Sequence, residues 1–259
     1  MKSYALIVLV VLLGRRNVRA DIPPGWSTNY TGTLAAAESA QQPILLYFTA
    51  SWCGPCRLMS RTTLNAPVIL QAISEVNHAA VDIDEHPDLA AKYNVAAVPT
   101  FVMLATAYDE SDRTTGFKTA DDFLPWLTNG VSAARLALAQ HVVARKSLAE
   151  IDRLLAATNV DAARQAVAKL FPLCDDREPA IAQTAVDRLK TIATRDPAGL
   201  LDGLNDPRLI TRIQVANALR SRIGDEFDID PWADAAARQK SILVWREKLR
   251  EGAHSSSVR

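Results

Sequence analysis

The sequence predicts an α/β domain over residues 21–130 and an all-α domain over residues 131–251. The α/β prediction rests on short apolar runs that alternate with helical patterns. The first of these runs, Ile44 to Phe48, precedes an amphipathic stretch from Arg57 to Leu70. The all-α prediction rests on a change of composition at Val131, after which Ala, Leu and Arg recur with helical spacing.

The α/β domain is expected to contain four strands and several helices. Residues 44–49 lack polar alternation, which indicates a strand that is buried on both faces. The other expected elements are a helix around residues 34–38 that ends before Pro43, a helix after Cys56 that breaks at residues 65–67 and resumes over 68–76, a strand at 79–83, a short helix at 87–93, a strand at 101–104, a turn at 109–113, a strand at 114–117, and a helix capped by Thr119 that ends at Gly130.

The all-α domain is expected to contain an internal repeat. Residues 170–176 match residues 200–206, and the helical patterns that follow also match at an offset of 30 residues, a period typical of stacked helical repeats. Further helices are predicted at 131–147, 148–157 and 160–171, with a terminal capping helix at 238–249 that turns Trp245 inward and a disordered tail at 252–259.

Residues 1–20 have the pattern of a secretory signal. Lys2 precedes an apolar run from Ala5 to Leu13, and Val18-Arg19-Ala20 forms a small-x-small cleavage site. The run is shorter than the ~20 residues that span a bilayer. We therefore expect export to the periplasm or cell envelope. Three arginines follow the run, which is unusual for a cleavage region, so an uncleaved, membrane-tethered form is the alternative.

Charge and cysteine usage narrow the classes of function. Without residues 1–20, which hold four bases and no acids, 25 bases remain against 29 acids, a net charge of −4. This balance argues against a nucleic-acid-binding surface. The chain has three cysteines, too few for a disulfide-stabilised secreted domain, so a disulfide between Cys53 and Cys56 is expected to be catalytic. Cys174 is interpreted as a small buried apolar residue.

The spacing of Cys53 and Cys56 allows a small disulfide that can close and reopen. The order strand, Cys-x-x-Cys, helix places Cys53 at or just before a helix start. The free amides and the positive dipole end there favour a thiolate, the nucleophile in disulfide exchange. Cys56, one turn later, is placed to resolve a mixed disulfide.

Three separated segments, residues 50–57, 81–87 and 93–101, together resemble the thioredoxin family. The resemblance implies a central mixed sheet flanked by helices and a protein-disulfide oxidoreductase with no cofactor. It also implies a cis proline at Pro99, backbone groups of Val98 and Thr100 that receive a substrate strand, and, from Gly54-Pro55, a reducing role. The residues expected at the substrate site are Trp52, Gly54, Pro55, Val98, Pro99 and Thr100.

Residues 200–207 and the following helix resemble a HEAT-type repeat. Helical arrays commonly bind protein segments, so protein binding by this domain is one expectation. A reductant outside the cytoplasm needs a source of electrons, which implies a membrane electron-transfer partner. The alternative is a non-catalytic interaction or scaffold protein of the cell envelope.

The chain departs from the thioredoxin pattern at two positions. Tyr47 and Ala80 occupy the places of a buried Asp and its Lys partner, and the joint loss avoids an uncompensated buried charge. The usual proton acceptor for Cys56 is then missing. Resolution at neutral pH should be slower than in a standard thioredoxin unless water, Glu38 or Glu75 substitutes.

Metal binding is not expected. A zinc site needs about four ligands, and the cysteine pair would have to recruit distant histidines. Residues 228–230 resemble the start of a calcium loop, but Trp232 replaces the next ligand, so a turn before Pro231 is the preferred interpretation.

Overall fold

The structure, a computed structural model, describes residues 20–157 and 160–256. The predicted signal segment, apart from Ala20, lies outside the described residues, as does the end of the predicted tail at 257–259. Within the described ranges, no helix combines the length and apolarity needed to cross a membrane.

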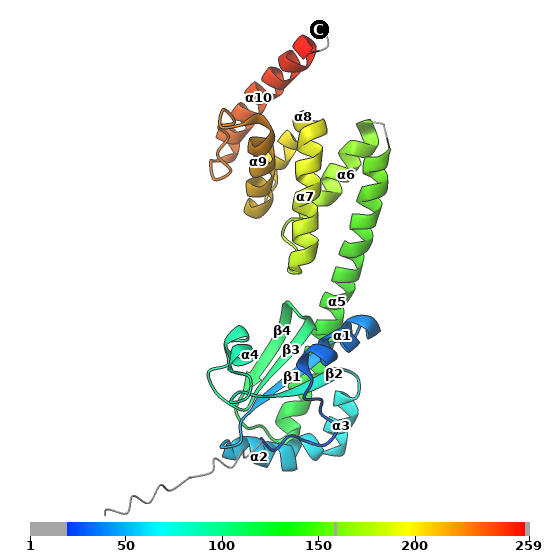
Figure 1. The fold of residues 1–259 in the computed structure, drawn as a ribbon, viewed down its shortest axis with the longest axis vertical. Helices are drawn as coiled ribbons and strands as arrows, with labels where there is room; N and C mark the ends of the chain where they lie inside the picture. The colour runs from blue at the N-terminus through cyan, green and yellow to red at the C-terminus, as the bar shows by residue number, and fades with distance from the viewer. Residues whose placement is uncertain (1–19, 158–159, 257–259) are drawn as a thin grey trace, which may run out of the picture.

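The first domain is built on a mixed sheet with the strand order β2-β1-β3-β4 (Figure 1). β1 (Ile44–Thr49) pairs in parallel with β2 (Asn77–Asp82) and antiparallel with β3 (Thr100–Thr106). β4 (Asp109–Thr115) pairs antiparallel with β3 at the edge. The carboxyl ends of β1, β2 and β4 and the amino end of β3 therefore meet at one edge of the sheet.

Helices cover both faces of this sheet. Leu45 and Tyr47 of β1 face one apolar core, whereas Leu46 and Phe48 face a second core on the other side. β1 is buried along its whole length, as its lack of alternation predicts. The first core is closed by α2 (Gly54–Arg61), the 3₁₀ turn η1 (Thr63–Asn65), α3 (Pro67–Ile73) and part of α5 (Ala120–Ala156); the second is closed by α1 (Tyr30–Ala40) and α4 (Pro87–Lys92).

The predicted turn at 109–113 is wrong. The turn lies at Ala107 and Tyr108, and β4 already begins at Asp109. Because β4 is an edge strand, it can carry a polar sequence that lacks the pattern of a buried strand. The strand ends at Thr115, before Gly116, whose φ of +88° favours glycine.

The predicted helix breaks at Gly130 and after Ser147 are also wrong. Thr119 caps α5 as expected, accepting a hydrogen bond from the amide of Asp122 at 3.3 Å, but the helix then continues to Ala156. A glycine inside a helix costs only about 1 kcal/mol relative to alanine, which the packing of α5 on the sheet can offset. α5 thus belongs to both halves of the molecule.

The second half of the chain is helical. Its apolar core takes residues from α5 onward and includes Ile151, Leu189 and Leu219. Trp245 is buried against this core, and its Nε1 donates to Asp228 at 2.8 Å, so the predicted inward-facing tryptophan is confirmed. The elements are α6 (Val160–Leu173), α7 (Pro179–Arg195), α8 (Pro197–Leu200), η2 (Leu201–Asn205), α9 (Leu209–Ile223) and α10 (Ala235–Ser256). α10 extends beyond the helix end expected near residue 249.

The internal repeat is confirmed. α7 and α9 begin 30 residues apart, at Pro179 and Leu209. The turn before each helix closes in the same way: Asp176 accepts from the Glu178 amide and Asp206 from the Arg208 amide, both at 2.9 Å. Such aspartate-closed turns fix the approach of the chain to each helix.

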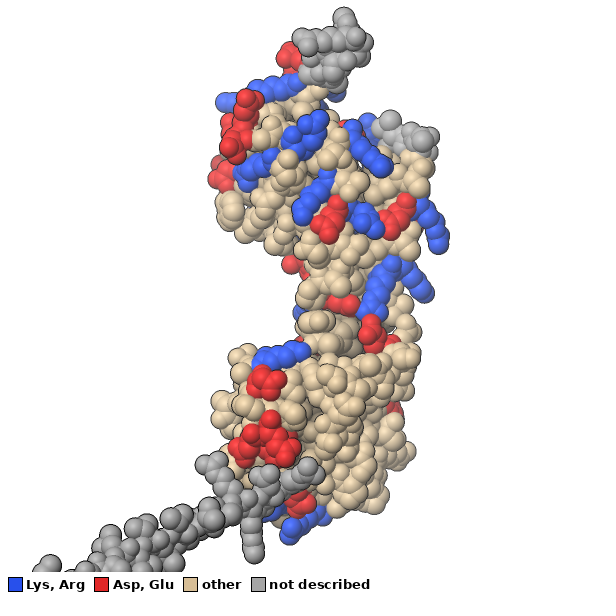
Figure 2. Space-filling model, in the orientation of Figure 1, with Lys and Arg blue, Asp and Glu red and all other residues tan. Residues whose placement is uncertain are grey.

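The helical half stands at the end of the sheet opposite α2 (Figure 1). On the face shown in Figure 2, the basic side chains gather over the helical half, whereas acidic side chains mark the sheet domain. Residues 21–130 carry five Lys and Arg against twelve Asp and Glu. The sheet domain is therefore the acidic part of the molecule.

Two glycines offer a matched test of the packing. A Cβ at Gly203 would lie 2.5 Å from the Phe171 ring and 2.8 Å from Val215, whereas a Cβ at Gly130 would meet Met103 at an ordinary 3.6 Å. We expect Gly203→Ala to lower the free energy of unfolding by about 1–3 kcal/mol through overpacking. Gly130→Ala should leave it unchanged or raise it by up to about 1 kcal/mol. Thermal unfolding followed by circular dichroism checks both, and equal destabilisation by the two substitutions would contradict the packing described.

Candidate active site

The dithiol lies where β1 ends and α2 begins. Cys53 is the N-cap of α2, and its Sγ accepts a hydrogen bond from the amide of Cys56 at 3.1 Å. The predicted position of Cys53 at the helix start is confirmed. A sulfur in this position faces the free amides of the first turn, which stabilise negative charge.

Cys53 and Cys56 are joined by a disulfide, and both residues are almost completely buried. The residues around them are open to solvent: Trp52 is 63% exposed, and Gly54 and Pro55 are exposed as well. A partner can therefore approach the disulfide from the Trp52 side, whereas Cys56 lies beneath.

The start of β3 lies beside Cys53. The Sγ of Cys53 is 3.6 Å from the carbonyl oxygen of Val98. The Val98–Pro99 peptide bond is cis, as expected. Thr100 is 2% exposed and hydrogen-bonds with Ala97 and Thr115 through its side chain. Of Val98 and Thr100, whose backbone groups were expected to receive substrate, Val98 presents its carbonyl oxygen to the sulfur.

Tyr47 fills the space beneath the dithiol. Its ring is fully buried and stacks on Phe101 with ring centres 4.6 Å apart, and Ala80 is its partner on β2. Its hydroxyl lies 3.4 Å from the carbonyl oxygen of Cys56. Burial raises the pKa of the Tyr47 phenol above its ordinary value, so the phenol stays neutral beside Cys56 at neutral pH.

The sequence did not predict the contacts that surround Tyr47. Its hydroxyl lies 3.5 Å from Ser60 Oγ, which donates to the carbonyl oxygen of Asp21 at 2.8 Å. Trp26 packs edge-on against the Tyr47 ring at 5.5 Å. The segment before α1 therefore closes this side of the core. Its only sequence signal is the aromatic Trp26 ahead of the first helix.

Glu38 and Glu75 do not take the place of the missing proton acceptor. Glu38 lies on α1 with its carboxylate 3.9 Å from Arg145, and Glu75 pairs with Arg135 at 3.0 Å. Both carboxylates are exposed and engaged away from the dithiol. Water is the remaining candidate of the three that the sequence suggested.

The sequence also raised Cys174, a metal site and residues 228–230 as possible functional features. Cys174 is buried, as expected, and burial raises the pKa of its thiol to about 12, which disfavours the reactive thiolate. Among residues 20–157 and 160–256, no group of three His, Cys, Asp or Glu side chains is arranged to hold a metal. Asp230 accepts from the Trp232 amide, as a turn before Pro231 requires.

Comparison with known proteins covers the sheet domain. The model of the family described as Thioredoxin matches residues 27–129. A thioredoxin H-type of Oryza sativa subsp. indica is 35% identical over 95 residues, which cover 36% of this chain and 72% of the relative. The TPR repeat-containing thioredoxin TDX of Arabidopsis thaliana is 42% identical over 81 residues, 31% of this chain and 20% of the relative, so the match spans a fifth of that protein.

Among solved structures, a thioredoxin from Thermus thermophilus is 29% identical, with a TM-score of 0.38, over 42% of this chain and 85% of that one. The motif, the sheet order and the match to most of the rice protein agree with one another. The chain belongs to the thioredoxin family of thiol–disulfide oxidoreductases.

Proposed function

We propose that this protein is an exported oxidoreductase that reduces disulfides in other proteins through Cys53 and Cys56. The observation that carries the proposal is the meeting of two segments 45 residues apart: Cys53 Sγ, capping α2, lies against the Val98 carbonyl beside Pro99. A sulfur activated by a helix start therefore faces a backbone carbonyl to which an extended substrate strand can donate a hydrogen bond.

The exchange runs in two balanced steps. The Cys53 thiolate attacks one sulfur of the substrate disulfide, and the other substrate sulfur leaves as a thiolate. Cys56 then loses its proton and attacks Cys53, which releases the second substrate thiolate and closes the Cys53–Cys56 disulfide. Two electrons pass to the substrate, so an external donor must reopen the disulfide before the next cycle.

Residues 1–20 support export, since their pattern is that of a secretory signal. We place the protein in the periplasm or cell envelope. The alternative is that the signal is not cleaved and tethers the protein to the membrane. Gly54-Pro55 supports the reducing direction through the family resemblance. A reductant in that compartment requires a membrane electron-transfer partner as its donor.

We further propose that the helical half is a HEAT-like module that binds protein. The support is the 30-residue offset between α7 and α9, each preceded by an aspartate-closed turn. It stands opposite α2, so it leaves the exposed face around Trp52 open to a substrate (Figure 1). We place the boundary between the domains within α5 and beyond the expected residue 130, because Val131 and Ala134 still belong to the sheet-domain core.

The first test traps the mixed disulfide. With Cys56→Ser and the signal intact, Cys53 should form covalent adducts that cannot be resolved and that vanish on treatment with reductant. Mass spectrometry of the adducts identifies the substrates and, through them, the compartment. Cys53→Ser is the matched control and should yield no adducts through Cys56, because Cys56 lies within the first turn of α2, beneath residue 53.

If Cys56→Ser gives no adducts and the wild-type protein fails to reduce insulin with dithiothreitol, reduction is not the function. The chain would then be a binding or scaffold protein that uses its thioredoxin fold for contact.

The second test concerns proton handling during resolution. The Tyr47 phenol is neutral because burial raises its pKa, so it cannot accept the Cys56 proton near neutral pH. Tyr47→Phe should therefore change the rate of single-turnover disulfide reduction by less than about twofold between pH 6 and 9. The long 3.4 Å contact to the Cys56 carbonyl predicts a stability loss below about 1 kcal/mol.

Stopped-flow fluorescence measures that rate, with Ser60→Ala as the companion variant. A pH dependence that disappears in Tyr47→Phe would show that the phenol does take part. Without a buried acceptor, the wild-type rate should rise with pH as solvent takes the Cys56 proton, and a pH-independent rate would contradict this account.

A further inference from the structure

The two apolar cores do not merge along α5. Ala134 is the last fully buried α5 residue of the sheet-domain core, and Ala144 is the first buried α5 residue of the helical core. The buried α5 residue between them is His141, which is 5% exposed. We call this part of the molecule, where the sheet domain meets the helical half, the seam. Here α5 buries a titratable side chain, whereas within each core it buries apolar ones.

His141 and Arg177 meet at one carboxylate of the sheet domain. Asp109, at the start of β4, has a side chain that is 4% exposed. Its Oδ2 lies 3.0 Å from His141 Nε2, and its Oδ1 lies 3.2 Å from Arg177 Nη1. Arg177 belongs to the loop between α6 and α7, so Asp109 joins the sheet domain to the helical half directly.

The same loop supplies two more carboxylates to this seam. His141 Nδ1 lies 3.2 Å from Asp176 Oδ1 and 3.9 Å from Glu178 Oε2. Glu178 in turn binds Arg145 of α5 at 2.6 Å. We call Asp109, His141, Arg145, Asp176, Arg177 and Glu178 the seam cluster.

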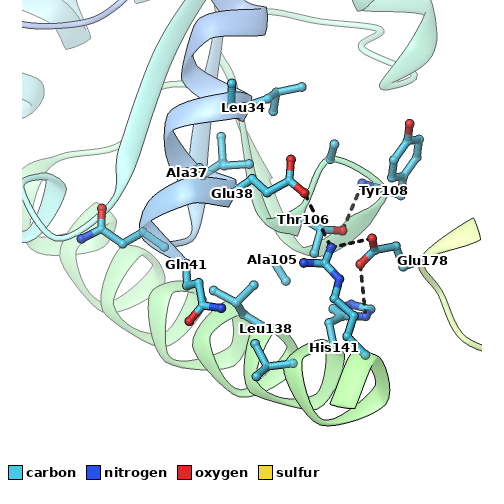
Figure 3. A pocket seen from close by; sticks show the side chains of 16 residues that line it. Leu34, Ala37, Glu38, Gln41, Ala105, Thr106, Tyr108, Leu138, His141 and Glu178 are labelled. Carbon is cyan, nitrogen blue, oxygen red and sulfur yellow. Dashed lines mark hydrogen bonds and ion pairs between the residues drawn. The ribbon is translucent and has the colours of Figure 1, made fainter. Parts of the chain in front are cut away.

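Apolar packing at the seam is incomplete. A cavity of about 280 Å³ lies between α1, α5 and the β3–β4 turn, with Leu34, Ala37 and Leu138 in its wall (Figure 3). Arg145 also lines the cavity and lies 3.9 Å from Glu38 on α1 and 2.6 Å from Glu178. Of the residues that line this cavity, Glu178 alone comes from beyond α5, so the helical half meets it through a charged side chain and not an apolar one.

We propose that the seam cluster is a clamp that fixes the orientation of the helical half relative to the dithiol domain. The carboxylate of Asp109 is buried, so removing a partner such as Arg177 leaves its charge less well compensated in a poorly solvated place. When the clamp is broken, only the single helix α5 connects the domains, and it is free to bend near His141.

The consequence for function rests on the proposed reductase activity. A protein bound to the helical half would meet the dithiol at a set distance and from a set direction. The clamp would then select substrates by geometry, while the chemistry at Cys53 stays independent of it.

The test uses the full chain with two substitutions that weaken the clamp. Asp109→Asn keeps the shape of the side chain and removes its charge. Arg177→Ala removes a side chain that is 73% exposed, so the fold is expected to survive. The matched control is Arg188→Ala, which breaks a 2.6 Å pair with Asp152 inside the helical half.

Hydrogen exchange followed by mass spectrometry reports on residues 136–146 of α5. Each clamp variant should exchange about tenfold faster there than wild type, the effect expected for losing a hydrogen bond between charged groups. Arg188→Ala should leave this segment unchanged. Small-angle X-ray scattering should show a broader distance distribution between the two halves for the clamp variants alone.

Unchanged exchange and scattering in both clamp variants would overturn the proposal. Should Asp109→Asn unfold the sheet domain, which faster exchange of β1 would reveal, Arg177→Ala decides alone. Reduction of insulin with dithiothreitol should remain at the wild-type rate in Arg177→Ala. If the wild-type protein does not reduce insulin, the reductase function is refuted. Hydrogen exchange would still test the clamp, because that measurement does not depend on activity.

Discussion

The arrangement of the chain depends on α5 remaining a single helix through two cores. Its first turns complete the thioredoxin core with Phe123 and Leu127, and its last turns join the helical core through Ile151. Gly130 does not break it, because a glycine inside a helix costs only about 1 kcal/mol relative to alanine and the packing of α5 on the sheet can offset this. One continuous helix therefore sets the axial position of the helical half, and only its rotation and tilt remain to be fixed by side chains at the seam.

The active site depends on backbone placement more than on charged side chains. Parallel pairing of β1 with β2 and antiparallel pairing with β3 bring Cys53 and Val98 to one edge. The helix start then activates the sulfur through amides that the fold leaves free. The site can therefore survive the loss of the buried charge pair, because neither the nucleophile nor its docking strand depends on that pair.

The sequence predicted the buried strand β1 to the residue, because an uninterrupted apolar run bounded by Pro43 has few alternatives. It also located Cys53, Pro99 and the 30-residue repeat. The sequence-based prediction was wrong at β4, whose polar residues are typical of a turn. It was also wrong at Gly130, where the packing of α5 outweighs the weak tendency of glycine to end a helix. The contacts among Tyr47, Ser60 and Asp21, and those among Asp109, His141 and Arg177, join residues far apart in the chain, so no local pattern could reveal them.

Where the thioredoxin pattern has a buried Asp and Lys, this chain has Tyr47 and Ala80, and we expect this replacement to slow the resolving step without a cost in stability. A buried pair carries a large desolvation cost, and its replacement by packed apolar groups is often neutral or stabilising. Here the phenol ring supplies that packing, stacked on Phe101 and flanked by Trp26. This replacement removes the buried carboxylate that could accept the proton of Cys56 within the core. The first attack by Cys53 is untouched, because its thiolate is stabilised by the helix start, so the change falls on the resolving step alone. A longer-lived mixed disulfide is the chemical consequence that we expect.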